Sequence, residues 1–192
     1  MIRISTRRLA CLALTIWACG TASAVAQVAS LASYAVKPSD VAIPEGETLG
    51  DYRRMIQPFR NWTLICDESL KSKRRVCNIT QTIVGAQGAV AFNWSLVATA
   101  EGKPLMVMRV PAAVGTGQPI ELAMGEKPDR IVAPTDRCDA GFCVATIAIG
   151  DMLRRHIRAG TPCRVSYPLP QAQPVVLEAP LEGLYLALSK LK

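Results

Sequence analysis

The sequence has one histidine, none of the common catalytic motifs and no apolar run long enough to cross a membrane. The lone His156 argues against a zinc site, because zinc ligands are histidines and closely spaced cysteine pairs. The P-loop, G-x-G-x-x-G, G-x-S-x-G and H-E-x-x-H patterns are all absent. A membrane-spanning helix needs roughly 20 apolar residues, and no stretch reaches that length. We therefore expect no transmembrane span, no metal and no cofactor.

The first 26 residues have the three parts of a secretory signal peptide. A basic start precedes a short apolar run, Leu9–Trp17, and small residues at Ala24 to Ala26 then permit cleavage before Gln27. The basic residues are Arg3, Arg7 and Arg8. This layout predicts an exported protein, either periplasmic or secreted to the cell surface.

The signal segment has an alternative interpretation as a lipoprotein signal, and the residues after the cleavage site form two predicted regions. Residues 16–19 resemble a lipoprotein acylation site, which would place a lipid on Cys19. After the cut, residues 27–55 are rich in Ala, Ser, Pro and Gly and predict a flexible leader. Residues 56–192 are then long enough for a single domain with its own core.

The charge balance argues against a nucleic-acid partner. The chain carries a formal charge of +7, and removal of the signal takes three of 22 basic residues and no acid, leaving 19 against 15, or +4. A nucleic-acid binder needs a denser basic stripe than this surplus provides. The one local cluster is predicted at a solvated hairpin tip and is a candidate surface for a protein, anionic lipid or glycan partner. Its residues are Lys71, Lys73, Arg74 and Arg75.

Five cysteines remain after the signal, and four form two pairs that are close in sequence. Cysteines this close pair readily in an oxidising compartment, which predicts disulfides Cys66–Cys77 and Cys138–Cys143. The second spacing is too wide for a redox-active C-x-x-C pair. Cys163 is left over. It is either buried and reduced or available to link two copies in a homodimer.

From residue 59 onward, short strand-like segments recur about every ten residues with turn residues between them. This spacing predicts an antiparallel β-sandwich. Two short helices are expected, one from Asp151 to Gly160 and one over Leu181–Leu191. The expected strands are Trp62–Cys66, Arg75–Val84, Ala89–Ala98, Pro104–Val110, Ile120–Met124, Arg130–Ala133, Phe142–Ile149, Cys163–Tyr167 and Val175–Ala179.

Two further groups of residues are weighed as functional sites. Trp62, Phe92 and Trp94 make a sugar-stacking platform one hypothesis, although packing in the core is the more ordinary role for such side chains. His156 is expected on a helix surface; an envelope hydrolase would require a nucleophile and a carboxylate beside it. No motif identifies either group. We therefore expect a protein without catalytic activity.

Several motifs in this order resemble the invasion-associated locus B family of exported bacterial proteins. They are the Trp62-x-x-x-Cys66 motif, the run from Cys77 to Gln81, and the turn from Cys138 to Cys143. The tail, with Val175 to Leu177 followed by Leu181 to Leu188, is similar as well. The resemblance covers roughly residues 61–191.

The resemblance implies an immunoglobulin-like β-sandwich with the two local disulfides. It also implies an envelope interaction protein, linked in some pathogens to attachment to host cells or invasion of them. No catalytic residues carry over from the family. The alternatives from the residues themselves are a periplasmic module that binds a small ligand or glycan, and an envelope hydrolase.

Overall fold

The computed structural model describes residues 41–98, 103–126 and 128–191. The predicted signal peptide and residues 27–40 of the predicted leader lie outside these ranges. The elements are β1 (Tyr52–Phe59), β2 (Trp62–Ser69), β3 (Arg75–Val84), β4 (Val90–Ala98), β5 (Pro104–Pro111), the 3-10 turn η1 (Ala112–Val114), β6 (Pro119–Met124), β7 (Asp129–Pro134), β8 (Arg137–Cys138), β9 (Phe142–Ala148), α1 (Asp151–Ala159), β10 (Cys163–Tyr167), β11 (Val175–Glu178) and α2 (Leu184–Leu188).

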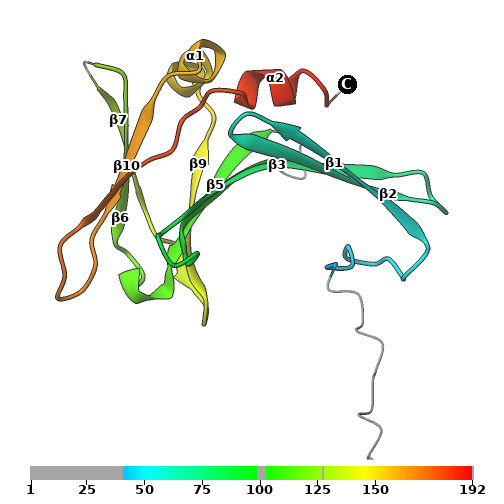
Figure 1. Ribbon diagram of the computed structural model, residues 1–192, viewed down its shortest axis with the longest axis horizontal. Helices are drawn as coiled ribbons and strands as arrows, with labels where there is room; N and C mark the ends of the chain where they lie inside the picture. The colour runs from blue at the N-terminus through cyan, green and yellow to red at the C-terminus, as the bar shows by residue number, and fades with distance from the viewer. Residues whose placement is uncertain (1–40, 99–102, 127, 192) are drawn as a thin grey trace, which may run out of the picture. The chain divides into compact units, whose positions relative to one another are not determined.

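These strands form two antiparallel sheets (Figure 1). The larger, sheet A, has seven strands in the order β1-β2-β3-β4-β5-β9-β8. The smaller, sheet B, has four strands in the order β11-β10-β6-β7. The predicted all-β sandwich with short helices, one of them near the C-terminus, is therefore confirmed. None of the described helices is long and apolar enough to cross a membrane.

Sheet A begins as a meander in which five consecutive strands each pair with the next. In β2, alternate side chains are buried, so Trp62, Leu64 and Cys66 enter the core while Thr63 and Ile65 face the other way. One face of the sheet is therefore apolar and continuous with the protein core. The opposite face takes the remaining residues of each strand.

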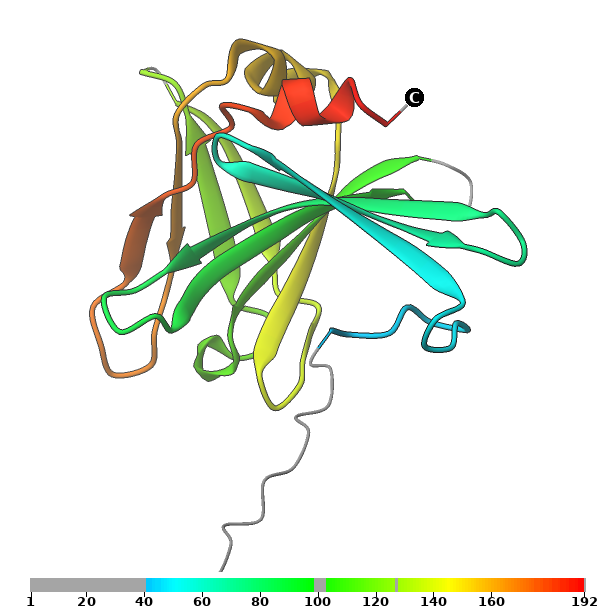
Figure 2. The same cartoon turned by 45° about the vertical axis from the view of Figure 1, so that its right-hand side comes forward.

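The core lies between the two sheets and beneath α2. The largest fully buried side chains come from both sheets and include Trp62, Trp94, Met106 and Leu122. The Tyr167 hydroxyl of sheet B donates a hydrogen bond to the Ala91 carbonyl oxygen, 2.6 Å away. Helix α2 packs against β1, β2 and β3, and lies above them in Figure 2. Both helices therefore cover edges of the core that the sheets leave open.

The two helices differ from the expectations at their ends. Helix α1 ends at Gly160 as predicted, with a left-handed φ of 63° that glycine adopts without strain. Its N-cap is Gly150 and not Asp151, so the helix has no capping hydrogen bond from a side chain. Helix α2 starts only at Leu184, because Gly183 before it has a φ of 94° that helical residues do not have. The predicted helix from Leu181 is therefore too long.

Two strands were not predicted. Strand β1 shows no clear alternation of apolar and polar residues, and both Met55 and Ile56 are exposed. It forms the edge of sheet A, and its first four residues fall in the segment assigned to the leader. Strand β8 has only two residues, too few for a periodic signal.

Candidate functional site

The predicted partner-binding residues form the tip of the β2–β3 hairpin, which we call the hairpin tip (residues 70–75). The Ser69 amide donates to the Arg74 carbonyl, and the Lys73 amide donates to the Ser69 carbonyl, each at 2.9 Å. Lys73 has a φ of 58°, a left-handed conformation that few non-glycine residues adopt. The backbone of the hairpin tip is thus folded by its own hydrogen bonds.

The cations of the hairpin tip are not equivalent. Lys71 Nζ lies 2.6 Å from the Asp51 carboxylate, and this contact lowers the pKa of Asp51 and raises the pKa of Lys71. Lys73 and Arg74 are exposed and form no salt bridge within the described part of the chain. These two side chains are therefore the ones available to a partner.

The base of the hairpin is pinned by a disulfide between directly paired residues. Cys66 and Cys77 face each other in the β2–β3 register, with Cα atoms 4.0 Å apart. Closing a loop with a sequence separation of 11 restricts the unfolded chain and stabilises the fold by about 3 kcal/mol in the chain-entropy model. On β1, Arg54 makes a bidentate pair with Asp67 of β2. The tip is thus held on a rigid base.

The hypothesis of a sugar-stacking platform is wrong. Trp62 is 1% exposed, and Trp94 and Phe92 are fully buried. The two indole rings stack with centroids 5.2 Å apart, and Phe92 tilts against Trp94. The rings pack against each other inside the core, so they offer no aromatic face to a ligand at the surface.

His156 is held at both ring nitrogens. Nε2 lies 2.9 Å from Asp129 Oδ2 at the start of β7, and Nδ1 lies 3.1 Å from Thr161 Oγ1. The Thr161 amide also donates to the His156 carbonyl, which closes the end of α1. The chain of carboxylate, imidazole and hydroxyl resembles a catalytic triad in composition. In this structure it joins the last turn of α1 to β7, and the hydroxyl belongs to the helix cap.

The second disulfide closes the turn between β8 and β9. Cys138 and Cys143 are paired, with Cα atoms 3.9 Å apart. Within the turn, Asp139 accepts hydrogen bonds from the amides of Phe142 and Gly141, which lower the pKa of its carboxyl. As at the first pair, sequence proximity predicted the bond. The carboxylate here organises a turn.

Cys163 is a free thiol, 1% exposed, on β10. Burial raises the pKa of this thiol from 9.0 to about 12. The thiolate is the reactive form of cysteine, so the folded protein keeps this group inert near neutral pH. A covalent dimer through Cys163 would require the strand to open first.

We expect the native protein at pH 8 to react with a soluble thiol reagent about a hundredfold more slowly than the protein in urea. Absorbance of the released product would follow the reaction. Protein that starts at Gln27, and so lacks Cys11 and Cys19, should show one thiol per chain on unfolding. A Cys163→Ser variant should release none in either state. Rapid labelling of the native protein, or a reductant-sensitive dimer on a gel, would contradict this expectation.

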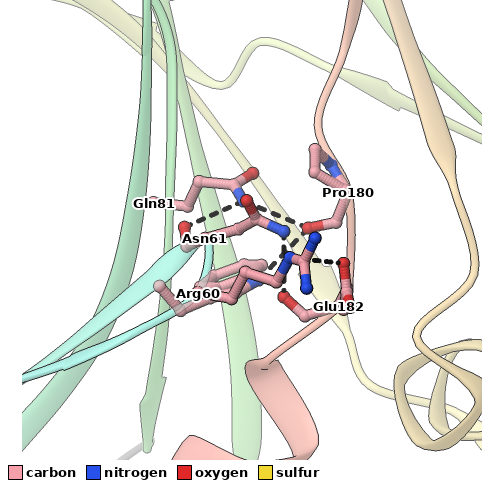
Figure 3. A network of polar contacts seen from close by, with 6 residues as sticks. Arg60, Asn61, Gln81, Pro180 and Glu182 are labelled. Atoms are coloured by element: carbon pink, nitrogen blue, oxygen red, sulfur yellow. Dashed lines mark hydrogen bonds and ion pairs between the residues drawn. The ribbon is translucent and has the colours of Figure 1, made fainter.

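A polar network joins the β1–β2 turn to the segment before α2 (Figure 3). The Gln81 side-chain amide donates to the carbonyls of Asn61 and Pro180, at 3.0 and 3.1 Å. The Arg60 guanidinium lies 3.2 Å from the Glu182 carboxylate. Trp62 Nε1 also donates to the Pro180 carbonyl. We call this group the C-terminal clasp; it holds residues 180–182 against sheet A.

A second polar network lies on the face of sheet A that points away from the core. Arg109 Nη1 donates to Asn93 Oδ1 at 3.1 Å and to Ser95 Oγ at 3.3 Å. The Asn93 amide in turn donates to the hydroxyls of Thr80 and Thr82. No motif in the sequence marks these residues. In the sequence they appear only as the polar residues of alternating strands. That pattern places them outside the core but does not show that they bond to one another.

No group of three or more potential metal ligands lies together in residues 41–98, 103–126 and 128–191. The predicted site residues lie in separate regions of the fold. The cations of the hairpin tip stand at one end of sheet A, and His156 lies on α1. The aromatic residues are inside the core.

Comparison with known proteins identifies the family. The model of the Invasion associated locus B protein family matches residues 62–192. A crystal structure of invasion associated protein b from Bartonella henselae aligns with a TM-score of 0.59 at 23% identity, covering 71% of this chain and 93% of that one. A search of curated proteins finds no match. The structural likeness supports the fold, and the family match spans the sandwich from β2 onward. The chain belongs to the Invasion associated locus B family.

Proposed function

We propose that this protein is exported to the cell envelope, in the periplasm or at the cell surface, and acts there as a non-enzymatic binding protein. Its proposed organisation is a signal peptide over residues 1–26, a leader over 27–55 and one domain over 56–192. The two disulfides support export, because such bonds persist in oxidising compartments. The layout of the first 26 residues supports it independently.

The observation that carries the proposed binding role is the geometry of the hairpin tip. Lys73 and Arg74 project as unpaired cations from a loop whose strands are cross-linked by Cys66–Cys77. A rigid base reduces the entropy lost when a loop is fixed by a partner. Exposed cations accelerate association with an acidic surface. The partner is therefore a protein or envelope component with negative charge.

The family description names invasion, and attachment to a host-cell surface is one form that such binding takes. Acidic groups are common to cell-surface proteins and glycans, so the same two cations suit this role. This finer assignment depends on the organism's way of life. The binding role itself does not.

A pull-down from envelope extract tests the proposal. Mature protein carrying Lys73→Gln and Arg74→Gln should recover the partner about fivefold less efficiently than the wild type, since both steering charges are lost. Quantitative mass spectrometry would measure recovery. The matched control carries Arg155→Gln and Arg158→Gln, which remove the same charge from exposed positions on α1. Equal recovery by all three proteins, or no specific partner with any, would refute the role of the tip.

A further inference from the structure

We propose that the outward face of sheet A binds an acidic segment of a partner protein that also carries aliphatic side chains. This face consists of the strand residues that alternate with those of the core. Sheet B and both helices contribute to the core on the other side. On this face Ile56 and Arg137 are exposed, and Ile65, Val97, Leu105 and Arg109 are partly exposed. The inference is independent of the hairpin tip.

The registers of the strands place an apolar row across this face. Ile56 of β1 pairs with Ile65 of β2, which pairs with Asn78 of β3. Beyond Asn78, the row continues with Val97 of β4, which pairs with Leu105 of β5. These side chains are outside the core cluster, although several apolar residues nearby in sequence belong to it. Ile56, at the β1 edge, is 62% exposed. A row of aliphatic side chains across several adjacent strands is a surface suited to apolar side chains of a partner.

A basic row runs parallel to the apolar row. Arg109 pairs with Val144 of β9, which pairs in turn with Arg137 of β8. Leu105 and Arg109 are four positions apart on β5, which corresponds to about 13 Å along a strand. A single polypeptide segment is wide enough to reach both rows with its side chains. The face is therefore amphipathic, with its positive side at β5, β9 and β8.

Arg109 has unused hydrogen-bonding capacity. Both of its described hydrogen bonds leave from Nη1 and end on the neutral oxygens of Asn93 and Ser95. Neither Arg109 nor Arg137 forms a salt bridge with a described carboxylate. Two acids lie in the same corner: Asp136 accepts a hydrogen bond from Thr146, and Asp139, which Arg137 influences electrostatically, accepts the amides of Phe142 and Gly141. A carboxylate from a partner is the ligand that a half-buried guanidinium binds best, through two parallel bonds.

Asn78 supplies a second, independent observation. Its Oδ1 atom is buried and has no hydrogen-bond partner in the described structure. Buried polar atoms are nearly always paired, so an unpaired acceptor indicates a missing donor. Asn78 sits within the apolar row, where a backbone or side-chain N–H of a bound polypeptide would satisfy it. An acyl chain could not do so.

The charges and side chains of the face favour an acidic polypeptide over other occupants. A second copy would bring another Arg109 and Arg137 to the interface and offer no described carboxylate of this face that is free of a hydrogen-bond or ion-pair partner, since Asp67 is paired with Arg54 and Asp136 with Thr146. An anionic glycan would satisfy the arginines but leave the aliphatic row facing water. A membrane would need protruding apolar side chains, whereas Ile65, Val97 and Leu105 are only partly exposed.

Selection from a random peptide library displayed on phage, with the mature protein as bait, tests this proposal. Selected peptides should be enriched in Asp or Glu together with Val, Leu or Ile. Arg109→Gln should weaken binding of a synthesised selected peptide about tenfold, as expected for loss of a charged bidentate contact. Replacing the acids of that peptide by amides should weaken binding by a similar factor.

Two variants separate binding from folding. Ile56→Ser changes an exposed edge residue outside the arginine network, and should weaken the same peptide about threefold through lost apolar contact. Lys73→Gln at the hairpin tip should leave the peptide affinity unchanged. The proposal is overturned by selected peptides without acids, or by peptides that bind wild type, Arg109→Gln and Ile56→Ser equally. Binding to anionic vesicles in place of peptides would overturn it too.

Discussion

Trp94→Ala should lower the free energy of unfolding by about 4 kcal/mol, the largest loss expected for a single substitution here. The ring is fully buried, stacks on Trp62 and contacts Phe92, so its removal leaves a cavity that neighbouring strands cannot close. Its Nε1 also donates to Gln81 Oε1 at 2.8 Å, and that acceptor loses its donor. Urea unfolding followed by circular dichroism would measure the change.

Tyr185→Ala is the control for the Trp94 substitution, since that aromatic ring is more than half exposed on α2. It should change stability by less than about 0.5 kcal/mol. A Trp94→Ala loss no greater than that of the control would mean that the aromatic cluster is not tightly packed. The same experiment also tests the sugar-stacking hypothesis, because removal of an exposed aromatic ring that stacks on sugar would lower the free energy of unfolding only slightly.

Gln81→Leu should lower the free energy of unfolding by about 3 kcal/mol, although the volume of the side chain is nearly kept. The Gln81 amide bonds the carbonyls of Asn61 and Pro180, and its oxygen accepts from Trp94. Leucine satisfies none of the three groups. The Pro180 carbonyl keeps its hydrogen bond from Trp62 Nε1, whereas the Asn61 carbonyl and the buried Trp94 indole N–H each lose the bond to Gln81. The effect comes from polar atoms left without partners and not from lost volume.

Gln87→Leu is a matched control for Gln81→Leu, since it is the same exchange at an exposed turn position between β3 and β4. Hydrogen exchange would add a local readout: amides of α2 should exchange faster in Gln81→Leu, because the C-terminal clasp is opened. Unchanged protection of α2 together with unchanged stability would show that the clasp does not hold this segment.

Strand-like patterns predicted β2, β3, β4, β5 and β9 of sheet A, including the β2–β3 hairpin that carries the first disulfide. At the second disulfide the sequence predicted the turn but not strand β8. Alternation worked where one face of a strand is buried, as in β2 and β3. It failed at β1, where Met55 and Ile56 are both exposed because the strand forms an edge with little of its surface against the core. Edge strands lack the one-sided burial that produces the pattern.

Roles that depend on contacts between residues far apart in the chain could not be predicted from the sequence. Gln81 bonds Pro180, 99 residues away, and local spacing carries no information about that partner. Trp62 and Trp94 suggested either a platform or a core cluster, and only the register of β2, β3 and β4 shows which face they occupy. The exposed cations at residues 73 and 74 were, in contrast, placed correctly at a turn.

The C-terminal clasp has a consequence for the order in which this protein folds. The Pro180 carbonyl oxygen accepts a hydrogen bond from the indole N–H of Trp62, which lies 118 residues earlier in the chain. The first hairpin therefore cannot reach its native environment until nearly the whole polypeptide is available. Topologies with such distant contacts fold in milliseconds to seconds. The reason is that the entropy of closing a long loop is lost before the contacts at its ends can stabilise the fold. If the proposed export delivers the chain N-terminus first, its core stays unfinished until the segment around Pro180 has arrived.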